Sequence, residues 1–243
     1  MTVQITEILR RSDQGFTKPF ICRADDGNIY FVKGNSAGRQ SQVYEWIAGH
    51  LALKINLPIA PFSLVDIPEE LIQTNPLYLQ DLGAGLAFGS QKQMITELTY
   101  SGINQVDDDL QKSVLAFDWW IKNEDRTLTE SGGNPNLFWD PDKEKLVVID
   151  HNLAFDDNFS IDKFKELHVF NRQNNQLFNN HANASKYAEK YKRVLNSWSE
   201  ICDSLPKEWY YLDSEMNDLA NIDLDKIYKI LERCTEDSFW NSP

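Results

Sequence analysis

Two acidic residues and one asparagine, each beside a short apolar run, have side chains that could hold a divalent cation and accept a proton. Asp125 lies next to Arg126, Asn136 precedes the apolar residues 137–139, and Asp150 ends a second apolar run. Phosphoryl transfer needs one carboxylate to take the hydroxyl proton, together with an Asn and an Asp as oxygen ligands for Mg²⁺. The order of these residues indicates that chemistry, although each carboxylate alone would be read as an ordinary turn residue of an acidic chain.

The stretch between Asn136 and Asp150 predicts a β-hairpin. Apolar residues 137–139 and 146–149 flank residues 140–143, whose order Asp-Pro-Asp-Lys is typical of a turn. Residues this far apart in the chain can meet only if the chain doubles back, and the hairpin would bring Asn136 close to Asp150. A surface hairpin without a functional role is the alternative.

The composition narrows the classes of binding partner and the cellular compartment that we expect for this chain. The chain has 243 residues, 42% of them hydrophobic, and a formal net charge of −13. The negative charge disfavours direct binding to nucleic acid or anionic membranes, but it does not exclude a protein partner that itself binds DNA. We expect no signal peptide and no membrane span. The three cysteines form no paired motif, which favours reduced thiols in a cytoplasmic protein.

Hydrophobic periodicity predicts strands and one helix first, then mainly helices. The strands are expected at residues 3–9, 20–23, 29–32 and 62–67, with a helix at 41–55. Residues 68–104 read as irregular, and helices are expected at 110–122, 161–168, 185–205, 206–212 and 224–233. This order predicts an α+β chain with two unequal lobes, a β-rich N-lobe (residues 1–75) and a mainly helical C-lobe (residues 76–243).

Several segments together resemble one family. They are Gly27-Asn28-Ile29-Tyr30-Phe31-Val32-Lys33, Ala37-Gly38-Arg39 with Glu45-Trp46, Leu57-Pro58-Ile59, Ala87-Phe88-Gly89-Ser90, Asn123-Glu124-Asp125-Arg126, Gly133-Asn134-Pro135-Asn136-Leu137, Ile149-Asp150-His151-Asn152-Leu153-Ala154-Phe155 and Leu205-Pro206-Lys207-Glu208-Trp209. Between residues 15 and 209, the chain is similar to the compact HipA-like branch of the protein-kinase-like fold. The resemblance implies a bilobal fold and the binding of ATP and Mg²⁺.

The resemblance also implies roles for single residues. Lys33 would contact the α- and β-phosphates and Glu45 would pair with it, whereas the alternative for Lys33 is an exposed strand end. Asp125 would be the catalytic carboxylate. Arg126 would either neutralise developing charge or brace its loop. Asn136 and Asp150 would hold the metal.

The sequence departs from the family pattern at the phosphate-binding turn, because no GxGxxG motif is present. Gly15 and Thr17 lie in the corresponding turn, whose backbone N–H groups could hold phosphate, although a generic hairpin is an equal alternative. Gly and Ala residues surround Leu86 and Phe88, and we expect Leu86 or Phe88 to contact the adenine. Asn134 is a rival to Asn136, which we prefer because it directly precedes the strand.

The leading hypothesis is an ATP- and Mg²⁺-dependent kinase that phosphorylates a hydroxyl group, most simply Ser or Thr of a protein substrate. The alternative is a kinase-like module that binds nucleotide or a partner without turnover, which the missing glycine-rich motif favours. A toxin-type regulator that acts with a DNA-binding protein partner rests on family analogy alone.

Overall fold

The computed structural model describes residues 2–13 and 17–240, and it divides into two compact units. The first, here called the barrel unit, comprises Met1–Trp46, Ala60–Met94 and Leu205–Ile222. The second, here called the helical unit, comprises Ile47–Ile59, Ile95–Ser204 and Asp223–Pro243. The mixture of helices and strands confirms the α+β class, while the division into lobes at residue 75 stays a prediction.

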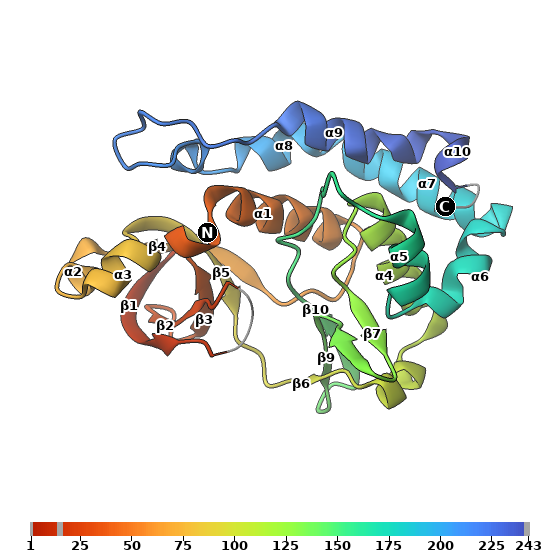
Figure 1. Cartoon of the computed structure of the whole chain (residues 1–243), viewed down its shortest axis with the longest axis horizontal. Coiled ribbons are helices and arrows are strands. Elements are labelled where there is room, and N and C mark those ends of the chain that lie inside the picture. Colours follow the sequence, from red (N-terminus) through yellow and green to blue (C-terminus); the bar gives the residue numbers. More distant parts are fainter. Residues whose placement is uncertain (1, 14–16, 241–243) are drawn as a thin grey trace. The chain divides into compact units, whose positions relative to one another are not determined.

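Five strands close into a barrel, shown from red to yellow in Figure 1. They are β1 (Thr2–Arg11), β2 (Phe20–Ala24), β3 (Ile29–Lys33), β4 (Phe62–Ile67) and β5 (Gly85–Gln91), in the spatial order β1-β2-β3-β5-β4. Parallel pairing of β1 with β4 closes the barrel, and the other pairs are antiparallel. The four strands that the sequence predicts are confirmed.

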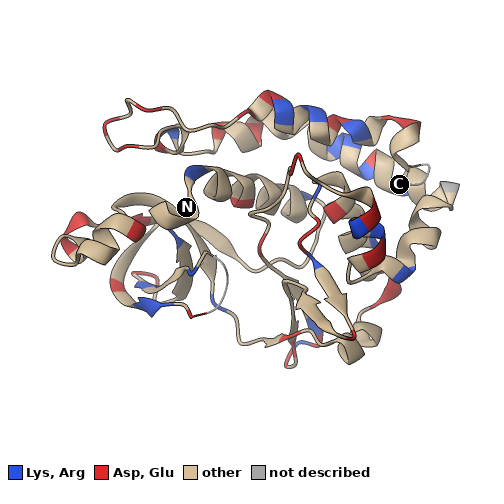
Figure 2. Cartoon of the chain, viewed as in Figure 1, with Lys and Arg blue, Asp and Glu red and all other residues tan. Residues whose placement is uncertain are grey.

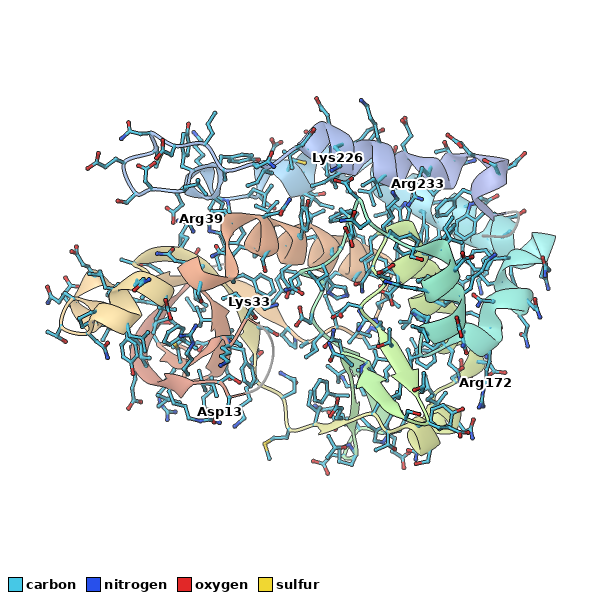
Figure 3. The ribbon with its side chains drawn as sticks, viewed as in Figure 1. Asp13, Lys33, Arg39, Arg172, Lys226 and Arg233 are labelled. Carbon is cyan, nitrogen blue, oxygen red and sulfur yellow. The ribbon has the colours of Figure 1, made fainter. Side chains whose placement is uncertain are left out.

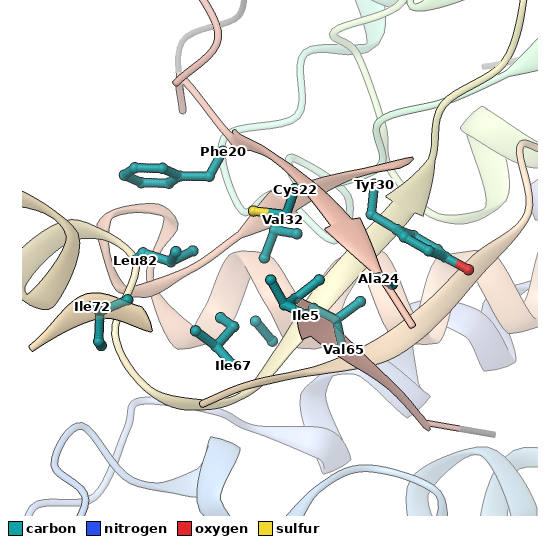
Figure 4. Packing of buried hydrophobic residues seen from close by; sticks show 11 residues of the cluster. Ile5, Phe20, Cys22, Ala24, Tyr30, Val32, Val65, Ile67, Ile72 and Leu82 are labelled. Carbon is teal, nitrogen blue, oxygen red and sulfur yellow. The ribbon is translucent and has the colours of Figure 1, made fainter. Parts of the chain in front are cut away.

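Strand alternation directs one set of side chains into the barrel. This core includes Ile5, Cys22, Val32, Val65 and Ala87, all at most 3% exposed (Figure 4). The side chains of alternate residues, such as Lys33 and Phe88, therefore lie on the outer face.

Strand β5 corrects the expectation that residues 68–104 are irregular. Its glycines and alanines suggest a loop, yet the narrow barrel interior requires small residues at this position. A Cβ at Gly89 would lie 2.4 Å from Val65 Cγ1, so a larger residue would collide with the core. The same stretch contains α2 (Glu69–Ile72), α3 (Pro76–Asp81), β6 (Thr96–Glu97) and η2 (Tyr100–Gln105).

The predicted hairpin is confirmed in the helical unit. Strands β9 (Leu137–Asp140) and β10 (Lys145–Val148) pair antiparallel, with Leu137 opposite Val148. β6 adds a third strand to this sheet. A second hairpin, β7 (Thr127–Thr129) and β8 (Gly132–Asn134), lies between Asp125 and Asn136 in the chain and was not expected.

Helices form the rest of the molecule. They are η1 (Asn35–Ala37), α1 (Arg39–Lys54), α4 (Asp108–Trp120), α5 (Ile161–Leu167), η3 (Asn171–Gln173), α6 (Asn174–Phe178), α7 (His181–Leu195), α8 (Trp198–Asp203), η4 (Lys207–Tyr210), α9 (Leu224–Glu232), η5 (Arg233–Thr235) and α10 (Asp237–Trp240). The expected single helix at 185–205 is wrong, because the N–H groups of Asn196 and Ser197 bond to carbonyls three residues back and end α7. No helix within the described residues is long and apolar enough to cross a membrane.

Candidate active site

Asp125 and Asn136 meet in the helical unit. Asn136 Nδ2 donates a hydrogen bond of 2.9 Å to Asp125 Oδ2, and Asn134 Nδ2 donates one of 3.1 Å to the same oxygen. Asn136 is buried, whereas Asn134 is exposed and Asp125 is half-buried. Both rival asparagines therefore orient the same carboxylate, and Asn136 is the one held within the protein.

The hairpin brings the residue before β9 next to the residues after β10. Ile149 N donates a hydrogen bond of 3.1 Å to Asn136 O, so Asn136 and Asp150 lie at neighbouring ends of the two strands. Both have left-handed backbones, with φ of 47° at Asn136 and 58° at Asp150. Asn and Asp tolerate this conformation better than most residues, and such strained positions often cluster at functional sites.

The electrostatics of Asp125 indicate a place for positive charge. Burial raises the pKa of the Asp125 carboxyl, and the negative charge of Asp150 raises it further, although the hydrogen bond from Asn136 opposes both effects. Two carboxylates that repel each other beside an amide oxygen form a donor set that fits Mg²⁺. Within the described residues, no three His, Cys, Asp or Glu side chains gather to hold a metal alone. Mg²⁺ at nucleotide sites is usually held by one or two carboxylates together with phosphates and water.

Arg126 braces the backbone of this site. Its side chain is completely buried, and Nε donates a hydrogen bond of 2.7 Å to Asp118 Oδ2 on α4. Nη1 donates to the carbonyl oxygens of Pro135 at 3.2 Å, Asn136 at 2.9 Å and Ile149 at 3.3 Å. One guanidinium thus joins the chain segments that carry Asn136 and Asp150. These contacts favour the bracing role over direct neutralisation of charge.

His168 completes a buried group with Asp118 and Arg126. His168 Nε2 lies 3.0 Å from Asp118 Oδ2, and Phe170 N donates a hydrogen bond of 3.1 Å to His168 Nδ1. Because Nδ1 accepts a hydrogen bond, the proton is on Nε2 and the ring is neutral. Burial lowers the pKa of His168, in agreement with this tautomer. Within this buried group, the carboxylate of Asp118 balances the positive charge of Arg126.

The sequence reasoning missed Asp118 and His168. Their separation of 50 residues gives no local pattern that would link them. One signal was present, since Asp118 is the charged residue within the otherwise apolar second half of α4 (residues 114–120), and a buried carboxylate requires a partner.

In the barrel unit, Lys33 and Glu45 form the expected pair. Lys33 is labelled in Figure 3. Its Nζ lies 2.5 Å from Glu45 Oε1, and the two residues are 7% and 3% exposed. The alternative of an exposed strand end is therefore wrong. Gln42 Nε2 donates a hydrogen bond of 3.0 Å to Gly34 O, which ties α1 to the residue after β3. The end of β3 and the helix that follows it are thus fixed next to each other.

The barrel face that carries Lys33 also carries aromatic residues. Phe88 lies opposite Lys33 in the pairing of β3 with β5. It is 4% exposed, and its ring stacks on Phe62 with a centroid distance of 5.6 Å. Phe88 therefore has little surface left for a ligand within this unit. Thr17 is half-buried just before β2, and Gly15 lies outside the described residues.

A hollow of about 230 Å³ lies on the barrel unit. Ile21 and Phe31 line it and lie opposite each other in the β2–β3 pair, with Phe31 two residues before Lys33 on the same strand face. Arg10, Ser12, Asp13 and Lys92 supply polar groups around it. Sequence reasoning did not identify these residues, because outer-face apolar positions of a short strand look like core positions in the sequence.

Comparison with known proteins gives one family. A family model described as HipA-like kinase matches residues 5–243, which is nearly the whole chain. No curated protein is similar enough to the chain to count as a match.

Proposed function

We propose, because the chain belongs to the family of HipA-like kinases, that it is an ATP- and Mg²⁺-dependent enzyme that transfers the γ-phosphoryl group to a hydroxyl. The acceptor is Ser or Thr of a protein. The observation that carries this proposal is the hydrogen bond between Asn136 and Asp125 at the hairpin end that also holds Asp150. It unites a base candidate with two oxygen ligands, as phosphoryl transfer requires.

Asp125 accepts the proton of the incoming hydroxyl in this proposal. The two asparagine amides both bond to Oδ2, and among the described residues no hydrogen bond engages Oδ1. Oδ1 is therefore the oxygen that receives the substrate hydroxyl. The raised pKa of Asp125 makes it a somewhat stronger base than an exposed aspartate.

Asn136 and Asp150 would hold Mg²⁺, which, when bound, neutralises charge on the phosphates. The chain's own contribution is to fix the two ligands before the nucleotide arrives. Arg126 provides this, because its hydrogen bonds to Asn136 O and Ile149 O hold the backbone on both sides. A rigid ligand arrangement loses less conformational freedom when the nucleotide binds.

Lys33 would bind the phosphates and Glu45 would orient it. A buried ammonium beside a carboxylate keeps its charge and its position, which a flexible surface lysine does not. Phe31, which is half-buried and lines the hollow, offers an apolar surface to the base on the strand face that carries Lys33. Phe88 would then support this face from its packing against Phe62, in place of direct contact with the adenine.

One pair of measurements separates this enzyme from a module that binds without turnover. The first is the thermal shift of the wild-type chain with ATP, in the presence and absence of Mg²⁺. The second is transfer of label from γ-labelled ATP to the chain or to proteins of a cell lysate. A Mg²⁺-dependent shift with transfer supports the kinase. A shift without transfer under any condition supports the binding module and overturns the proposal.

A further inference from the structure

A basic groove lies on the helical unit, formed by one side of α7 and the end of α1. Its volume is about 760 Å³, and four of its lining residues are the cations Lys54, Lys186, Lys190 and Arg193. Glu189 is the one acidic residue that lines it. Figure 2 shows the lysines and arginines of α7 in blue, on a chain whose net charge is −13. Positive charge is thus concentrated at this groove, although the chain as a whole is negatively charged.

The cations follow helical spacing along α7. Lys186, Lys190 and Arg193 are three and four residues apart, so their side chains lie on one face of the helix. The lining residues of α7 and its end run from Ala182 to Ser197, which corresponds to about 22 Å of helix. Ala182 is exposed and lines the groove, whereas Val194, which also lines it, is only 6% exposed. The groove is therefore elongated, with charges along it.

Two of the four cations have weak partners, and the other two form no ion pair with any residue that the structure describes. Arg193 contacts Glu189 at 3.3 Å and Lys54 contacts Glu200 at 2.9 Å, and each pair has at least one largely exposed side chain, so it contributes little. Within the described residues, no carboxylate forms an ion pair with Lys186 or Lys190. Lys190 is half-buried, and its pKa is lowered by burial and by the charge of Lys186. A negative ligand here would relieve this repulsion.

We propose that this groove binds an acidic segment of a partner protein, of about seven residues if the segment is extended. Carboxylates of the segment pair with Lys186, Lys190, Arg193 and Lys54, and its apolar side chains contact Ala182 and the aliphatic stems of the lysines. This interaction does not depend on the kinase activity, since none of these residues belongs to the groups around Asp125 or Lys33.

Charge and shape favour a peptide over nucleic acid as the occupant. Nucleic acid is bound through many phosphate contacts over an extended basic surface, and the net charge of this chain repels such a polyanion at long range. A short acidic segment needs only local complementarity with the four cations. Its apolar side chains also match the apolar parts of the groove, which phosphates do not.

The test is the affinity of a fluorescently labelled peptide of about seven residues, alternating glutamate and leucine, measured by anisotropy. Lys190→Glu and Lys192→Glu form a matched pair, because both change the same charge on the same helix and Lys192 does not line the groove. We expect wild type to bind saturably, Lys190→Glu to weaken binding at least about tenfold, and Lys192→Glu to change it less than about twofold. Lys186→Glu, at an exposed position, repeats the test should Lys190→Glu fail to fold.

Four results would overturn the proposal. They are the absence of saturable binding to wild type, equal binding of a peptide with glutamine in place of glutamate, equal weakening by both variants of the matched pair, and tighter binding of a single-stranded oligonucleotide of the same charge. Self-association of the chain that Lys190→Glu abolishes would also contradict it, because a second copy would then occupy the groove. Binding should weaken as salt rises, since the contacts are between charges near the surface.

Discussion

Asn136 contacts the Asp125 carboxylate through its side chain and the residue before Asp150 through its backbone. Its side-chain amide donates to Asp125 Oδ2 at 2.9 Å, while its backbone carbonyl accepts from the N–H of Ile149, the residue before Asp150. Arg126 Nη1 bonds to the same carbonyl at 2.9 Å. The position of Asn136 therefore depends on both ends of the hairpin and on a buried cation.

Asn136 and Asn134 should differ in their effect on turnover. Asn136→Gly removes the proposed ligand and keeps the left-handed backbone, because glycine adopts positive φ without strain. We expect Asn136→Gly to lower phosphoryl transfer at least about tenfold, and Asn134→Gly, which removes only an exposed donor to Asp125, to lower it much less. Initial rates of label transfer for the two variants decide this. A larger loss of transfer rate for Asn134→Gly than for Asn136→Gly would mean that Asn134, and not Asn136, is the metal ligand.

Asp150 should be required for metal-dependent nucleotide binding. Asp150→Asn removes the charge and retains a residue that tolerates φ of 58°. We expect the affinity for ATP in the presence of Mg²⁺ to fall at least about tenfold, because a ligand charge is lost beside the phosphates. Asp142→Asn, on the exposed turn of the same hairpin, is the control. If calorimetry gives wild-type affinity for Asp150→Asn, Asp150 is not a metal ligand.

Lys33 should matter for stability as well as for activity. Lys33→Met leaves the buried Glu45 carboxylate without its ammonium partner, and breaking such a pair typically costs about 3–5 kcal/mol of unfolding free energy. The double variant Lys33→Met/Glu45→Met should recover much of this stability, since it removes both charges. It should not recover activity. Denaturant unfolding and label transfer measure the two effects, and recovery of activity in the double variant would make Lys33 purely structural.

The buried group around Asp118 should make the fold sensitive to acid. Burial lowers the pKa of His168 below 6.5, and Arg126 with His168 outweighs burial to hold the pKa of Asp118 well below 3.8. The unfolded chain then binds more protons than the folded chain, so stability falls as pH falls, first below about 6.5 through His168 and then below about 4 through Asp118.

Unfolding free energy measured against pH tests this. His168→Gln should reduce the slope between about pH 6.5 and pH 5, because glutamine does not titrate. His50, whose pKa burial also lowers, contributes to the same slope, so the quantity of interest is the difference between variant and wild type. An unchanged slope would mean that His168 has the same pKa in the folded and the unfolded chain.

The parts of the fold that the sequence predicts are those with local signals. The turn residues 140–143 between two apolar runs specify the β9–β10 hairpin, and alternation with turn residues specifies β2 and β3. The pairing of Lys33 with Glu45 follows from a strand end and a nearby helix in the same unit. In each case the residues that decide the structure lie close together in the chain.

The parts that the sequence does not predict depend on distant contacts. Strand β5 looks like a loop because its small residues are selected by the barrel interior at Val65 and not by local propensity. The group of Asp118, Arg126 and His168 forms only when α4 packs beside the hairpins. The bracing role of Arg126 can therefore be distinguished from charge neutralisation only by its contacts in the folded chain.

The most direct test of the account is transfer of the γ-phosphoryl label by wild type and Asp125→Asn, measured side by side with Mg²⁺ and ATP. Asparagine keeps the shape and can still contact a hydroxyl, but it cannot accept the proton. We expect the variant to keep its fold and its affinity for ATP with Mg²⁺ and to lose about 10²–10⁴ in transfer rate, the usual contribution of one positioned acid–base group. Equal transfer by wild type and Asp125→Asn would contradict the account, because the carboxylate that Asn136 orients would then have no part in the reaction.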